Sequence, residues 1–191
     1  LRLCGLIMHM PKTIRFAHRT EPFQESVIRE MTRLGAQCGA VNLSQGLPEF
    51  ESPPAALAAA VAAIQAGDNQ YSYPFGTHAF RAAIADRMRG YNQVAADPES
   101  EITVTCGVTE AISTALMAIV NPGDEVIILE PFHESYLPAA LFAGATPRFV
   151  ALDPPDYRLD LDRLRASFSA RTRAILVNTP HNPTGRVLTP A

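Results

Sequence analysis

The sequence predicts an α/β fold, with three layers (αβα) around a mostly parallel sheet. From residue 101 onward, strand-length apolar runs alternate with helix-length segments, which is typical of βαβ units. The runs at 126–129 and 174–177 are continuously apolar, as in parallel strands that are covered on both faces. Proline or glycine follows these runs within a few residues, so we expect sharp loops at the strand ends.

The first hundred residues are predicted to be mainly helical. Alanine, the strongest helix former, dominates residues 55–64, and Ser52 is a suitable N-cap for a packed helix there. Upstream, apolar side chains recur at helical spacing as far as Leu34, and Gly35 suits a C-terminal cap. Two loops marked by glycine and proline separate the helices. The predicted helices cover residues 21–34, 52–64 and 78–88.

The second half carries the predicted sheet. Turn residues such as Asn121-Pro122-Gly123-Asp124 punctuate it, and we find no internal repeat. The crossovers between parallel strands are expected to be right-handed. The predicted strands are 102–105, 126–129, 148–152 and 173–177, and the helices between them are 109–120, 135–143 and 160–168.

Composition narrows the functional classes. The chain has 191 residues, 47% of them hydrophobic, so it is a globular protein rather than a disordered one. Its net charge of −3, with no basic block, disfavours nucleic acid or an anionic membrane as a partner. No apolar run is long enough to span a bilayer. Cys4, Cys38 and Cys106 have no metal or redox spacing, which indicates free thiols and a cytoplasmic location.

The segment Thr105-Cys106-Gly107-Val108-Thr109 is predicted to join a strand to the start of a helix. Free N–H groups at a helix N-terminus bind anions, and the helix dipole adds to the attraction. Gly107 lets a ligand approach the backbone, and Thr109 adds a hydroxyl donor. The pattern is neither a Walker loop nor GxGxxG, and every βα unit has such a turn. A phosphate site and an ordinary turn therefore both stay open.

Two further polar residues follow strand ends. Asn182 comes after the 174–177 run, and His133 after the 126–129 run. Ligands of open α/β sheets bind beyond the carboxyl ends of strands, so we expect Gly107, His133 and Asn182 to converge on one sheet edge. Asn182 can alternatively close an Asx turn before Pro183. His133 can be an acid, a stacking surface or a solvated residue, and no second ligand stands at metal spacing.

Taken together, the motifs resemble the class I and II aminotransferases, which are pyridoxal-phosphate enzymes of fold type I. The motifs occur in the family's order over residues 40–187. They resemble most the branch of kynurenine, glutamine and methionine aminotransferases. The segments that carry the resemblance are Asn42–Phe50, Asn69–Tyr71 with Phe75-Gly76, Thr103–Ala111, Pro122–Val126, Glu130–Phe132 with Tyr136, and Asn178–Gly185.

The resemblance implies cofactor contacts. Gly107, Val108 and Thr109 would hold the phosphate of pyridoxal 5′-phosphate. His133 would stack on the pyridine ring, where the family more often has phenylalanine, tyrosine or tryptophan. Asn182 would donate to the phenolic oxygen of the cofactor and also border the substrate.

The resemblance also implies substrate and subunit contacts. Gly46 would lie against the substrate carboxylate, although an ordinary turn glycine also fits the local sequence. Tyr71 would reach the phosphate of a neighbouring subunit and point away from its own, which implies a homodimer. Tyr71 and Tyr73 can otherwise plug a surface groove.

The complete protein is then expected to transfer an amino group between an L-amino acid and a 2-oxo acid. We expect residues 1–50 to be an N-terminal arm and small-domain segment, and 51–191 an incomplete large domain. The only lysine is Lys12, in the N-terminal arm, and the family's catalytic lysine lies beyond the Asn178–Gly185 motif. The 191-residue chain alone is therefore expected to be inactive. A β-eliminating C–S lyase of the same fold and a non-catalytic fragment are the alternatives.

Overall fold

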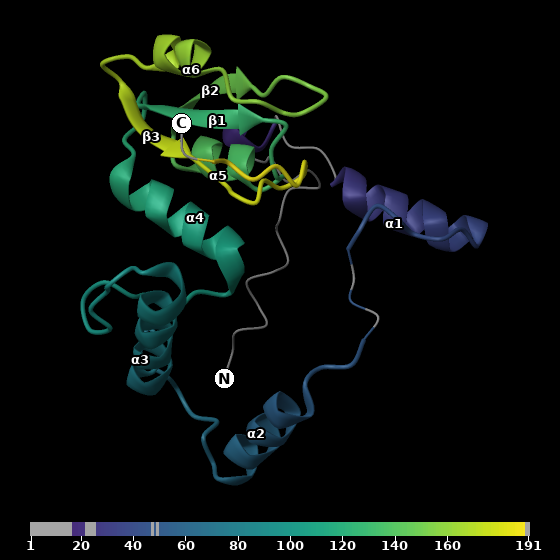
Figure 1. Cartoon of the computed structure of the whole chain (residues 1–191), viewed down its shortest axis with the longest axis vertical. Helices are drawn as coiled ribbons and strands as arrows, with labels where there is room; N and C mark the ends of the chain where they lie inside the picture. Colours follow the sequence, from purple (N-terminus) through teal and green to yellow (C-terminus); the bar gives the residue numbers. More distant parts are fainter. Residues whose placement is uncertain (1–16, 22–25, 47, 49, 190–191) are drawn as a thin grey trace, which may run out of the picture. The chain divides into compact units, whose positions relative to one another are not determined.

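The structure, a computed structural model, describes residues 17–21, 26–46, 48 and 50–189. It divides into two compact units (Figure 1). The helical unit is Met31–Ala115, and the sheet unit combines Leu1–Glu30 with Leu116–Ala191. The predicted boundary after residue 50, between a small-domain segment and an incomplete large domain, stays a prediction.

A three-stranded parallel sheet forms the centre of the sheet unit. The strands are β1 (Glu125–Glu130), β2 (Thr146–Ala151) and β3 (Thr172–Leu176), and they lie in the order β2-β1-β3. Ile128 of β1 is aligned with Phe149 of β2 and with Leu176 of β3. Three of the four predicted strands are thus present, and the predicted α/β class with a parallel sheet is confirmed.

The core of the sheet unit is built on β1. Its residues Val126–Leu129 are at most 3% exposed, because the strand is paired on both sides and covered on both faces. Side chains of a strand alternate between faces. Ile127 and Leu129 therefore share one face, where they form a core cluster with Val150 and Leu152.

Two helices cover the sheet. Helix α6 (Leu161–Ser167) packs on the core cluster through Leu164, and helix α5 (Tyr136–Phe142) contacts β1 and β2. Figure 1 shows them on opposite sides of the sheet. The side chain of Asp160 caps α6, as predicted, by accepting the N–H groups of Asp162 and Arg163. This arrangement is the αβα layering that the sequence indicates.

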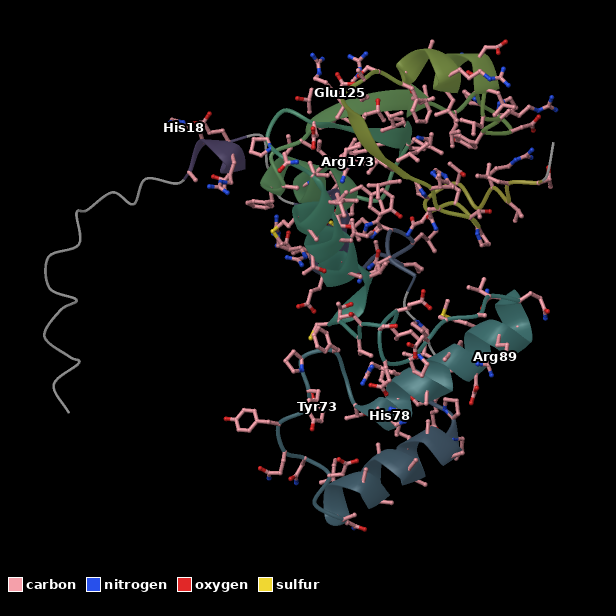
Figure 2. The ribbon with its side chains drawn as sticks, turned by 90° about the vertical axis from the view of Figure 1, so that its left-hand side faces the viewer. His18, Tyr73, His78, Arg89, Glu125 and Arg173 are labelled. Atoms are coloured by element: carbon pink, nitrogen blue, oxygen red, sulfur yellow. The ribbon has the colours of Figure 1, made fainter. Side chains whose placement is uncertain are left out.

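Glu125 begins β1 and carries a buried charge. Its side chain, labelled in Figure 2, is 1% exposed. It accepts hydrogen bonds from Ser169 at 2.7 Å and from Arg171 at 2.6 and 3.2 Å. Arg148 lies 3.7 Å away on β2. These bonds, first that of Ser169 and then those of Arg171, hold the pKa of Glu125 below its ordinary value. Ser169 and Arg171, which follow α6, are thereby bonded to the amino end of β1.

Five helical segments lie in the first part of the chain or lead out of it. A short 3₁₀ turn, His18–Thr20, precedes them. No helix among the described residues has the length and apolar character needed to cross a bilayer. The segments are α1 (Val27–Cys38), α2 (Pro54–Gln65), α3 (His78–Arg87), the π-helical turn η2 (Met88–Asn92) and α4 (Gly107–Ile119).

Three details of these helices differ from prediction. Helix α1 runs through Gly35 and reaches its left-handed glycine, with φ of 62°, only at Gly39. Helix α2 has Pro53 at its N-cap with no side-chain cap, so Ser52 does not play that role. None of the residues of α2 is buried, because its apolar side chains find no cover among the described residues.

The predicted strand 102–105 is not a strand. It has no regular secondary structure, and the Val104 N–H donates to the carbonyl oxygen of Phe75 at 3.0 Å rather than to a sheet neighbour. The prediction was wrong because a strand requires a partner as well as an apolar pattern, and the described sheet contains only β1, β2 and β3.

Candidate functional site

His133 and Asn182 leave the sheet at the same edge. His133 follows β1 by three residues, and Asn182 follows β3 by six. Since β1 and β3 are parallel neighbours, their carboxyl ends lie side by side. This is the edge at which open α/β sheets bind ligands. Gly107 belongs to the helical unit, and its convergence on this edge stays a prediction.

The histidine is oriented by its own loop. Nδ1 of His133 accepts the N–H of Ser135 at 3.3 Å and lies 2.8 Å from the Ser135 hydroxyl. With Nδ1 used as an acceptor, the neutral ring carries its proton on Nε2. The ring is half-buried, and its centroid lies 5.7 Å from that of Tyr136. Next to it, Phe132 stacks on Phe149 of β2 with 5.6 Å between ring centroids, which anchors the loop to the sheet.

Asn182 stands in a tightly bonded loop. Its N–H donates to Oδ1 of Asn178 at 2.7 Å, so the Asx-type contact is made by Asn178 and not by Asn182. The loop then turns at Gly185, whose φ of 73° favours glycine. Asn182 itself is exposed, and among the described residues its side-chain amide has no hydrogen-bond partner. That amide is free to serve a ligand.

In the helical unit, helix α4 begins at Gly107. Val108 and Thr109 therefore lie in its first turn, where backbone N–H groups have no intrahelical acceptor. Gly107 has φ of 81°, and apart from its chain neighbours no atom of the described residues lies within 4 Å of the position of a Cβ, so a ligand can approach it. The Glu110 carboxylate accepts the N–H of Cys106 in the same turn. This places one internal negative charge beside the N–H groups that are offered to an anion.

A hollow of about 330 Å³ adjoins this helix start. It is lined by the aromatic loop and by the residues that precede α4, namely Ser72, Tyr73, Pro74, Gly76, Val104, Thr105, Cys106 and Glu110. Tyr71 does not contribute to it. The Tyr71 side chain is fully exposed, at 105%, and so does not pack on Thr109 of its own chain. That is the arrangement expected if Tyr71 serves another subunit, a role that stays a prediction.

Gly46 follows a loop that is tied to α1. The side chain of Asn42 donates to Thr32 at 3.1 Å and accepts the N–H of Ser44 at 3.0 Å. Gly46 is exposed, and in the part of the chain that the structure describes no atom beyond its chain neighbours lies within 4 Å of its Cβ position. The backbone there is accessible to a substrate, as its predicted role requires.

The remaining observations concern the lysine, the cysteines and potential metal ligands. Lys12 and Cys4 lie outside the described residues. Cys38 and Cys106 are free, exposed thiols. No group of three potential metal ligands occurs in the part of the chain that the structure describes.

Sequence reasoning missed two residues near Asn182. Asn178 and His181 both hold the loop through hydrogen bonds. The role of Asn178 could have been predicted, because it follows the predicted strand 173–177 directly and asparagine at such a position commonly accepts backbone N–H groups. Nothing in the sequence distinguishes a buried His181 from an exposed one.

Comparison with known proteins fixes the family. Residues 39–191 match the family described as aminotransferase class I and II. The chain belongs to this family. The match covers the sheet, the start of α4 and the loops that carry His133 and Asn182, and it confirms the resemblance predicted from the motifs.

Relatives within the aminotransferase family are similar over most of this chain. A Mycobacterium tuberculosis protein named "Probable N-succinyldiaminopimelate aminotransferase" is 46% identical over 172 residues, covering 89% of this chain and 43% of its own length. The methionine aminotransferase of Escherichia coli (strain K12) is 41% identical over 165 residues, covering 85% of this chain and 42% of its own.

A solved structure agrees with the fold. The structure of N-succinyldiaminopimelate aminotransferase from Mycobacterium tuberculosis has a TM-score of 0.88 and 45% identity, and it covers 92% of this chain and 46% of the known one. The present chain thus spans less than half the length of the curated relatives that it matches.

Proposed function

We propose that this chain is the amino-terminal portion of a pyridoxal-phosphate aminotransferase that transfers an amino group between an L-amino acid and a 2-oxo acid. Family membership supports an aminotransferase-like activity. The observation that carries the proposal is the placement of His133 and Asn182 at the carboxyl ends of the neighbouring parallel strands β1 and β3. In this class of fold, that edge holds the ligand.

The start of α4 fits a phosphate group. Val108 and Thr109 offer first-turn N–H groups, the Thr109 hydroxyl is a further donor, and Gly107 leaves open space beside the backbone. The Glu110 carboxylate would repel a bound phosphate, but its hydrogen bond to the Cys106 N–H keeps it at one side of the turn. We assign the phosphate of the cofactor to Gly107, Val108 and Thr109.

The sheet edge fits an aromatic ring with a phenolic oxygen. The imidazole of His133 is flat, half-buried and oriented by Ser135, so it offers a stacking face. The free amide of Asn182 can donate to the phenolic oxygen and border the substrate, and Gly46 offers accessible backbone to the substrate carboxylate. When bound, pyridoxal 5′-phosphate supplies the electron sink, and these residues orient it.

Tyr71 supports a homodimer. Its side chain is fully exposed among the described residues, and a phenolic hydroxyl is a good donor to a phosphate of a partner subunit. We also propose a cytoplasmic location, on the ground that its three cysteines are far apart in the sequence.

Binding of pyridoxal 5′-phosphate to the 191-residue chain tests the proposal. Thr109→Val removes one hydroxyl donor to a charged group and should weaken binding about 10- to 100-fold. Thr114→Val is the matched control, because Thr114 lies on the same helix and its hydroxyl bonds the helix's own carbonyl groups of Glu110 and Ala111. Equal affinity in the two variants, measured by equilibrium dialysis, would exclude a contact between the Thr109 hydroxyl and the phosphate. Pyridoxal without its phosphate should bind both variants alike.

A further inference from the structure

His181 is a buried titratable residue to which the proposed function gives no role. It is 4% exposed, and it uses three groups to close its loop. Its N–H donates to the Arg186 carbonyl oxygen at 2.7 Å, its carbonyl oxygen accepts the Gly185 N–H at 2.6 Å, and its ring Nδ1 lies 2.8 Å from Thr184 Oγ1. The ring bond and the backbone bonds therefore tie together the residues on both sides of the 182–185 turn.

Asn182 is the first residue of that turn. Its N–H is fixed by Asn178 on the strand side, at 2.7 Å. Its backbone follows directly from His181, and the bonds of His181 to Thr184, Gly185 and Arg186 connect it to the residues that come after Asn182. The Asn182 side chain makes no bond of its own among the described residues, so its direction depends on the backbone that these neighbours hold.

We propose that His181 is a positioning residue: its buried ring, bonded to Thr184 across the turn, holds the backbone of Asn182 so that the amide faces the ligand. This proposal rests on the proposed function, which assigns Asn182 to the phenolic oxygen of the cofactor. It adds a residue pair, His181 and Thr184, that does not touch the ligand but sets the strength of that one contact.

The hydrogen-bond roles in the pair are complementary. Thr184 Oγ1 accepts the Arg186 N–H at 3.3 Å, which leaves the hydroxyl proton free to donate to Nδ1 of His181. Nδ1 is then an acceptor, and the neutral ring carries its proton on Nε2. Burial lowers the pKa of His181, which favours this neutral form. An isosteric side chain without the hydroxyl would leave Nδ1 without this donor.

The test compares two ligands that differ only at the phenolic oxygen. Pyridoxine 5′-phosphate carries the phenolic hydroxyl and has no aldehyde to react with Lys12, and its 3-deoxy analogue lacks the hydroxyl. The wild-type chain should prefer pyridoxine 5′-phosphate about tenfold, the value of one hydrogen bond to Asn182. Thr184→Val should reduce the preference to about twofold, and Thr184→Ser, which keeps the hydroxyl, should retain the preference of about tenfold.

Thr179→Val is the matched control. Thr179 lies in the same loop, and its hydroxyl accepts the Leu188 N–H at 3.0 Å, away from the His181 ring. Its variant should keep the tenfold preference within about twofold. Calorimetric titration gives the affinities, and urea unfolding checks that each variant is folded. Thr184→Ala repeats the test if the valine variant does not fold.

The outcomes separate the two levels of the proposal. A folded Thr184→Val or Thr184→Ala chain that keeps the full preference overturns the positioning role of His181 and leaves the assignment of Asn182 intact. A wild-type chain without any preference, or an Asn182→Ala chain that keeps it, overturns the assignment of Asn182 and the positioning role with it. Loss of preference in the Thr184 variants, but not in Thr179→Val, supports the proposal.

Discussion

Replacing Gly76 by alanine should destabilise the helical unit by about 2–5 kcal/mol. Gly76 has φ of 93°, a conformation that costs an L side chain roughly 1–2 kcal/mol. The added Cβ would lie 2.6 Å from Cγ2 and 2.8 Å from Cβ of Val104, well inside van der Waals contact. Overpacking of this kind costs about 1–3 kcal/mol. The two effects act on the same new atom and together give the stated range.

Two measurements check this prediction. Urea unfolding followed by circular dichroism gives the change in the free energy of unfolding. Hydrogen exchange at the Val104 N–H reports the local effect, because that group is bonded to the Phe75 carbonyl oxygen beside Gly76. Adding Val104→Ala to the Gly76 variant removes Cγ2 but not Cβ, so it should recover only part of the lost stability.

Gly90→Ala is the control for the glycine substitution itself. Among the described residues, no atom outside its immediate chain neighbourhood lies within 4 Å of the Cβ position of Gly90, and its φ is not in the left-handed range. Its unfolding free energy should change by no more than about 0.5–1 kcal/mol. If Gly76→Ala and Gly90→Ala shift the urea midpoint equally, the close approach of Gly76 to Val104 does not limit the stability of this unit.

Three further predictions concern the sheet and the lysine. Glu125 has a lowered pKa, so its contribution to stability should be complete above pH 4.5 and decline as the pH falls through that lowered pKa. Urea midpoints between pH 7 and pH 3 should show this decline, and Glu125→Gln should flatten it. Ile127→Ala should cost about 2–5 kcal/mol in the same assay, because the side chain is fully buried in the core cluster. Borohydride reduction of the 191-residue chain with pyridoxal 5′-phosphate should give no site-specific adduct and no amino-acid turnover. Specific labelling of Lys12 with turnover would contradict the expectation that this chain is inactive alone.

The sheet unit was predictable because its signals are local and strong. Residues 126–129 are apolar at every position, and a short run of this kind between turn residues is typical of a strand that is covered on both faces. The strand over 102–105 failed for the opposite reason. Its short β-branched pattern is compatible with a strand, but pairing depends on a neighbour, and the sequence does not state where its neighbour lies.

The candidate site was predictable only in part. His133 and Asn182 could be placed because they lie in the loops that follow strand ends, and topology brings parallel strand ends together. The support for Asn182 could not be foreseen, since His181 and Thr184 meet through a turn whose geometry depends on Gly185 and on the prolines around it. Helix propensity similarly placed α2 but said nothing of whether its apolar side chains would be covered.

The strand order β2-β1-β3 has a consequence for how the protein is made. β1 leaves the ribosome first but ends up in the middle of the sheet, so it gains its first neighbour when β2 is synthesised and its second only with β3. Until then one edge of the most apolar strand is exposed to pairing with another nascent chain. The Asn182 loop emerges after β3 and is therefore the last described part of the edge to acquire its support. Pausing of translation between residues 151 and 172 would prolong the interval in which β1 is paired on one edge only.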